Sequence, residues 1–179
     1  MRPTRYNHLA IALHWVLALG LLYELALGLW MVDIPKTPPG LRAEWFNWHK
    51  SIGMSLGLLI VLGGLWRLHS GAPALPQHLP GWQQSLAKIN HAVLYTCMVL
   101  TPLCGFLGSS FSPYSIKFFG LALLKFWAAS PQLKEFMSTV HYGAGRLLML
   151  AIALHIAAAV WHALRRDGVV ARMLPGKSA

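Results

Sequence analysis

The segment HYGAGRLLMLAIALHIAAAVWHA, residues 141–163, decides how this chain folds. It is predominantly apolar and longer than the ~20 residues that an α-helix needs to cross a bilayer, yet it carries histidines at positions 141, 155 and 162. Placing an imidazole in the hydrocarbon core costs free energy unless the ring has a partner, so each histidine here is a candidate functional residue. His141 and His155 are 14 positions apart, which puts them about 40° out of register and roughly 21 Å apart along a helix. One helix face would then present two imidazoles at two membrane depths.

The composition indicates a membrane protein. Of the 179 residues, 56% are hydrophobic and only 11% are charged, whereas soluble domains are about 25% charged. The formal net charge is +10, but the basic residues lie between apolar runs rather than on an amphipathic surface. This pattern is typical of charges that flank a membrane, so we expect lipid contacts and no nucleic-acid partner.

Four apolar runs predict an all-α, integral membrane four-helix bundle in a single domain, residues 1–179. The expected spans are about 9–32, 49–68, 88–110 and 140–164. Prolines and glycines in the segments 33–48 and 71–81 indicate non-helical connections. The longest connection, 111–139, contains FFGLALLKFW (118–127), which is too short to cross and is expected at the interface or over one end of the bundle.

The distribution of basic residues favours cytoplasmic termini. Four spans put both termini on one side, and positive charges concentrate on the cytoplasmic side of membrane proteins. Eight basic residues flank the spans on the terminal side: Arg2, Arg5, Arg67, Lys88, Arg165, Arg166, Arg172 and Lys177. Six lie on the other side: Lys36, Arg42, Lys50, Lys117, Lys125 and Lys134.

This topology sorts four histidines into two pairs of equal depth. His49 begins the second span and His141 begins the fourth, so both are expected near the outer surface. His14 lies early in the first span and His155 late in the fourth, so both are expected in the inner half. Two bis-imidazole haem sites need this arrangement on facing helices. Interhelical hydrogen bonding is the alternative; zinc is disfavoured because neither level offers a cysteine or carboxylate to complete a tetrahedral site.

Two further histidines are expected near the inner end of the bundle. His162 competes with His155 for the inner pair, but a site built on His162 would lie roughly 31 Å from the His141 level, about the full hydrocarbon thickness. His155 is therefore preferred. His91 and His162 are instead expected to contact a quinone, since a neutral imidazole can hydrogen-bond a carbonyl and deliver protons. The alternative is that both side chains simply reach the interface.

Two charged residues lie well inside the spans, away from the span ends. Glu24 and Arg146 are both expected in the outer half, where an unpaired charge is expensive. We therefore predict that they form an ion pair. The alternative is that either side chain faces a haem propionate or a wet cleft.

At these histidines the chain resembles the bacterial cytochrome b561 family of small four-span, dihaem membrane proteins. The resemblance covers nearly the whole chain. Its matching motifs are ALHW around His14, WHKSIG with His49, HAVLYxxxxxxPLCG from His91 to Gly105, the fourth-span histidines and the tail MLPGK. One departure is Gly63, where family members often carry an arginine; Arg67 remains at the end of that span.

The resemblance implies a bacterial inner-membrane cytochrome that holds two b-type haems and transfers electrons to or from quinone. The implied axial ligands are His14, His49, His141 and His155. Some members are oxidoreductases that pass electrons from superoxide to ubiquinone, which a cationic outer face would favour by attracting a small anion. Ordinary lipid and solvent contact is the alternative role of that face. A membrane-anchor subunit that relays electrons from a partner dehydrogenase or hydrogenase, and a non-redox structural or transport bundle, remain the alternative functions.

Overall fold

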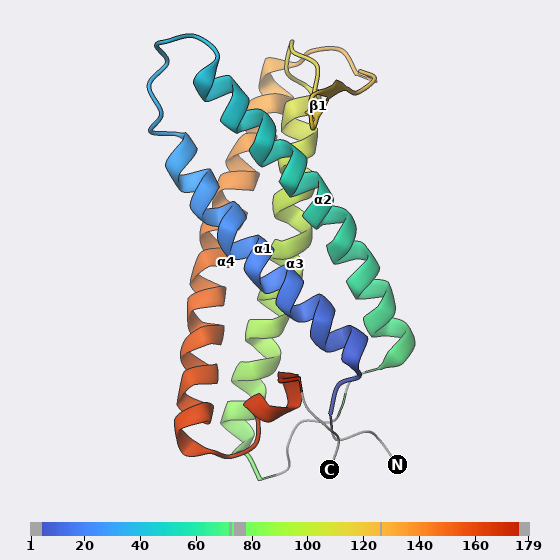
Figure 1. Ribbon diagram of the computed structural model, residues 1–179, viewed down its shortest axis with the longest axis vertical. Coiled ribbons are helices and arrows are strands. Elements are labelled where there is room, and N and C mark those ends of the chain that lie inside the picture. Colours follow the sequence, from blue (N-terminus) through green and yellow to red (C-terminus); the bar gives the residue numbers. More distant parts are fainter. Residues whose placement is uncertain (1–4, 72, 74–77, 126, 176–179) are drawn as a thin grey trace.

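The computed structural model describes residues 5–71, 73, 78–125 and 127–175 (Figure 1). Within these residues it has four helices that are long and apolar enough to span a membrane. They are α1 (His8–Met31), α2 (Leu41–Ser70), α3 (Gly81–Ser110) and α4 (Pro131–Arg165). The helices alternate in direction along the bundle (Figure 1). The chain is therefore an all-α four-helix bundle, as predicted.

Local sequence signals begin and end these helices. The Asn7 side chain accepts a hydrogen bond from the Ala10 amide at 2.8 Å and caps α1. Glycines in the left-handed region flank α2, Gly40 at φ 104° and Gly71 at φ 70°. Ser130 caps α4 through the Leu133 amide. At least one end of α1, α2 and α4 is thus marked by a residue whose side chain or backbone freedom suits a helix end.

Two segments expected to be connections are partly helical. Residues 41–48 were predicted to lie in the first loop, but α2 already begins at Leu41. Residues 131–139 were predicted to lie in the third, but α4 begins at Pro131. The length of an apolar run reflects the thickness of the hydrocarbon core. A helix can extend beyond that core because its backbone hydrogen bonds also form in the interface. Two of the basic residues counted for orientation, Arg2 and Lys177, lie outside the described residues. Pro76 of the second connection and the last two residues of the MLPGK motif also lie outside them.

A short hairpin covers one end of the bundle. Strands β1 (Lys117–Phe118) and β2 (Leu121–Ala122) pair antiparallel beside α2 and α3 (Figure 1). Ser51 of α2, which is only 1% exposed, connects the hairpin to this helix. Its hydroxyl oxygen accepts a hydrogen bond from the Phe119 amide at 2.9 Å and donates one to the Lys117 carbonyl at 3.3 Å. This end corresponds to the predicted outer surface.

The helix order brings α3 and α4 into the most extensive packing, with α1 against α2 and α2 against α3. Leu148 and Ala151 are buried in the middle of α4, 1% and 2% exposed. At the opposite end from the hairpin, a 3-10 helix, η1 (Val170–Met173), folds back on α1. There the Trp15 indole donates to the Met173 carbonyl at 2.8 Å. The C-terminal segment therefore lies at the end of the bundle that was predicted to be the inner one (Figure 1).

Candidate functional site

The predicted outer pair of histidines is brought together between α2 and α4. The ring centres of His49 and His141 lie 6.1 Å apart, with ring planes at 85°. The His141 Nδ1 atom lies 2.7 Å from the carbonyl oxygen of Thr101 on α3, a contact that orients the ring. Gly105 provides the space: a Cβ atom there would lie 2.8 Å from the same nitrogen. Three helices thus determine where this pair lies.

The predicted inner pair is brought together between α1 and α4. The ring centres of His14 and His155 are also 6.1 Å apart, with ring planes at 60°. Both sides of the pair are positioned by long helices that cross the bundle, and α4 contributes one imidazole to each level. Equal depth was therefore a sound basis for pairing these four histidines.

His91 lies against the inner pair, which the sequence argument did not predict. Its ring centre is 5.4 Å from that of His155, and its Nδ1 atom is 2.6 Å from the Ala87 carbonyl one helical turn earlier. His91 was expected only near the inner end of its span. Its position along α3 could have placed it at this level, but its lateral contact depends on how α3 is rotated about its axis.

Glu24 and Arg146 do not pair, so that prediction was wrong. Glu24 is 8% exposed on α1, and its Oε1 atom lies 2.8 Å from the Nδ1 atom of His49. The expectation that neither histidine level offers a carboxylate was therefore wrong for the outer pair. Arg146 instead stacks on the ring of Tyr142, at 4.1 Å from the ring centre, and donates a hydrogen bond to its hydroxyl. Similar depth in the membrane was not enough to predict a contact, because the two side chains face different neighbours around the bundle.

His162 lies at the inner end of α4 and is paired with a carboxylate. Its Nδ1 atom is 2.6 Å from Oδ2 of Asp167, just beyond the helix. Burial opposes ionisation of Asp167, but the hydrogen bonds from His162 and the Val169 amide prevail and hold the pKa of Asp167 below its ordinary value. A hollow of about 330 Å³ adjoins this group. It is lined by His78, Leu79, Pro80, Gln83, Arg165 and Asp167.

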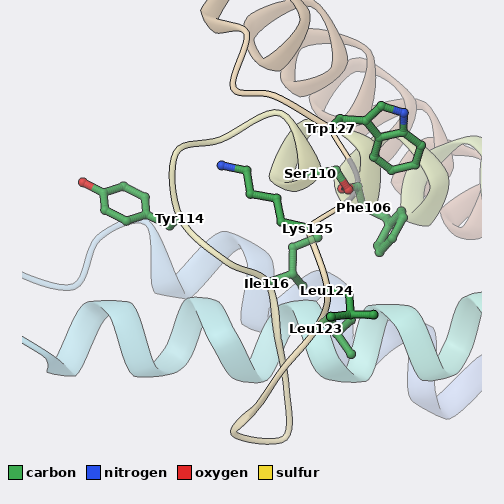
Figure 2. A pocket seen from close by; sticks show the side chains of 8 residues that line it. All are labelled: Phe106, Ser110, Tyr114, Ile116, Leu123, Leu124, Lys125 and Trp127. Carbon is green, nitrogen blue, oxygen red and sulfur yellow. The ribbon is translucent and has the colours of Figure 1, made fainter.

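A second hollow, of about 260 Å³, lies at the hairpin end (Figure 2). Its lining is Phe106, Ser110, Tyr114, Ile116, Leu123, Leu124, Lys125 and Trp127. Among the described residues, the lining is largely apolar and includes no histidine. None of the residues that line this hollow therefore belongs to either histidine pair.

Comparison with known proteins decides the family. The profile described as prokaryotic cytochrome b561 matches residues 5–176. The chain belongs to this family. It is 29% identical over 184 residues to cytochrome b561 homolog 2 of Escherichia coli (strain K12), covering 99% of this chain and 94% of that protein. It is 24% identical over 175 residues to cytochrome b561 homolog 1 of the same strain, covering 96% and 97% respectively.

Family membership makes the chain a multi-pass membrane cytochrome of b type that functions in electron transfer. The family implies a b-type haem, and the histidine geometry can be tested against that group. Metal–imidazole bonds are about 2 Å long, so two imidazoles that share one metal ion have ring centres about 6 Å apart. Both observed separations of 6.1 Å fit this requirement. The cytochrome therefore has two histidine pairs whose ring separation is compatible with binding one iron between them.

Proposed function

We propose that this cytochrome holds two b-type haems, the outer one between His49 and His141 and the inner one between His14 and His155. The observation that carries the proposal is the equal 6.1 Å separation of the two pairs. Each haem iron would supply reversible one-electron chemistry. The chain supplies the axial nitrogens, their orientation, and a spacing of roughly 21 Å along α4 between the two ligand levels.

The reaction we propose is oxidation of superoxide at the outer face coupled to reduction of ubiquinone at the inner end. Two superoxide ions each lose one electron and become O₂, and one quinone takes up two electrons and two protons to become quinol. Six basic residues belong to the segments at the hairpin end, where they would attract a small anion: Lys36, Arg42, Lys50, Lys117, Lys125 and Lys134. They outnumber the three acidic residues on that side, Asp33, Glu44 and Glu135.

At the inner end, His162 is the proposed quinone contact. With Nδ1–H donating to Asp167 at 2.6 Å, Nε2 of the neutral ring is an acceptor, and it would donate to a quinone carbonyl once the ring takes up a second proton. The carboxylate can then support proton transfer through the imidazole, because it stabilises the protonated ring. His91, beside His155, is the second proposed contact. The termini in this proposal face the cytoplasm, and the protein resides in the bacterial inner membrane.

The first test measures haem content in purified wild-type protein and in His14→Ala, His49→Ala, His141→Ala and His155→Ala variants. Each variant should lose one of two haems, because a single remaining imidazole holds iron poorly. His69→Ala is the control, since His69 lies near the end of α2 against Trp66. Full haem content in any of the four variants would overturn the corresponding ligand assignment.

The second test separates superoxide oxidation from an anchor-subunit role. Purified protein in lipid nanodiscs is mixed with superoxide, and haem reduction and quinol formation are followed in time. Rapid reduction followed by quinol formation supports the proposed enzyme. If only a partner dehydrogenase or hydrogenase reduces the haems, the cytochrome is the membrane-anchor subunit of a larger complex. His162→Ala should slow quinol formation while haem content is retained.

A further inference from the structure

We infer that Glu24 is a positioning residue: its carboxylate accepts the Nδ1 proton of His49, so that Nε2 of the same ring faces the iron of the outer haem. The inference rests on the proposed haem site between His49 and His141. It adds a residue from α1, a helix that contributes no ligand to that site.

The first observation is the isolation of the pair from other polar groups. Oε1 of Glu24 and Nδ1 of His49 are 2.8 Å apart. Both carboxylate oxygens and this nitrogen are buried, and among the described residues none of the three makes a hydrogen bond of standard geometry, so the close contact between the two side chains is the polar contact that each has. A carboxylate in the apolar part of a membrane bundle is expensive unless a partner compensates it. The imidazole of His49 is the group that does so here.

The second observation is that two glycines make room for the pair in a reciprocal way. Gly28 lies one turn after Glu24 on α1, and a Cβ atom there would be 3.2 Å from Cε1 of His49. Gly53 lies one turn after His49 on α2, and a Cβ atom there would be 3.0 Å from Oε1 of Glu24. Each helix therefore accommodates the functional side chain of the other. The crossing of α1 and α2 is built around this contact.

The chemistry of a ligating histidine gives the contact a purpose. A neutral imidazole that coordinates through Nε2 must carry its proton on Nδ1, and metal-bound histidines almost always donate that proton to a carboxylate, a carbonyl or water. His141 meets this need with the Thr101 carbonyl at 2.7 Å. His49 meets it with Glu24. The outer site thus has one neutral and one charged acceptor behind its two ligands.

A charged acceptor has a measurable consequence. A carboxylate near the iron stabilises the more positive, oxidised state and makes the ligand more basic, and both effects lower the midpoint potential. In the described part of the chain no carboxylate lies at ion-pair distance from His14 or His155. The effect of Glu24 should therefore be confined to the outer haem.

The test is a potentiometric titration of the purified holoprotein, followed by its absorption spectrum, with low-temperature EPR of the oxidised haems. Glu24→Gln keeps the shape and an acceptor oxygen but removes the charge. One of the two transitions should rise by about 59 mV, a tenfold change in the one-electron equilibrium constant, and the other should not move. Glu24→Leu also removes the acceptor, so it should additionally weaken binding of one haem by about 10–100-fold and alter one set of EPR g values.

Glu44→Gln is the matched control, because Glu44 is an exposed carboxylate in the first turn of α2. It should leave both transitions unchanged. The inference is overturned if Glu24→Gln moves neither transition, moves both equally, or is matched by Glu44→Gln. His49→Ala separates this failure from failure of the haem site itself. If that variant keeps both haems, the ligand assignment is wrong; if it loses one while Glu24→Gln has no effect, only the positioning role is wrong.

Discussion

Gly105 on α3 determines how closely that helix can approach the ring of His141. A Cβ atom there would lie 2.8 Å from Nδ1 of His141, closer than unbonded atoms tolerate. Gly105→Ala should therefore displace the ring from both the Thr101 carbonyl and the proposed iron position. We expect about 10–100-fold weaker binding of one haem, measured by titrating haem into the apoprotein.

Gly63→Ala provides the control for this substitution. A Cβ atom at Gly63 would make an ordinary contact, 3.6 Å from Leu17. Haem affinity should be unchanged. Equal losses in both alanine variants would show that helix packing in general, rather than the His141 ring, is sensitive to added volume.

Asp167 makes the inner end of the molecule sensitive to acid. Its pKa in the folded protein is below the ordinary value of 3.8, because the hydrogen bonds from His162 and Val169 outweigh the effect of burial. A carboxyl group with a depressed pKa stabilises the fold above its unfolded pKa, and this contribution is lost as the pH falls through the folded value. Wild type should therefore lose thermal stability below about pH 4, and Asp167→Asn should lose less. Parallel acid profiles for the two proteins would contradict this.

At the level of elements, Ser51 connects the hairpin to α2. Its hydroxyl is shared among the Asn47 carbonyl at 2.8 Å, the Lys117 carbonyl and the Phe119 amide. Ser51→Ala leaves the Phe119 amide without its side-chain acceptor, at a cost of about 0.5–1.5 kcal/mol, the net contribution of a typical hydrogen bond. The melting temperature should fall, and the Phe119 amide should exchange faster with deuterium. Ser55→Ala, which removes only a bond to the Ser51 carbonyl within α2, should have a smaller effect on both.

The helices themselves were largely predictable from the apolar runs, and their ends were not. The first run, 9–32, differs from α1 (His8–Met31) by one residue at each end. The second, third and fourth helices begin well before their runs, at Leu41, Gly81 and Pro131. Hydropathy reports which side chains prefer lipid, whereas helix ends are determined by caps such as Ser130 and by glycine conformation at Gly40. The hairpin at 117–122 left no clear signal because each strand has only two residues.

At the scale of the whole molecule, the depth of each side chain along the bundle was predictable from the sequence, whereas its neighbours on adjacent helices were not. Helix rise and alternating direction place His49 with His141 and His14 with His155, and the rings meet at 6.1 Å in both pairs. The same reasoning paired Glu24 with Arg146 wrongly and did not anticipate His91 beside His155. Lateral neighbours depend on the rotation of each helix about its axis, and that is determined by small-residue contacts such as those of Gly28 and Gly53.

The charge of the whole outer face leads to the last prediction. If its lysines and arginines steer superoxide towards the outer haem, the second-order rate of haem reduction should fall steeply with ionic strength, because the screening length shrinks from about 10 Å at 0.1 M salt to about 3 Å at 1 M. Lys117→Gln with Lys125→Gln should lower the rate at low salt and flatten its salt dependence. Reduction by an uncharged quinol is the control and should not respond to either change. A superoxide rate that is insensitive to salt would remove steering as a role of this face and leave lipid and solvent contact as its explanation.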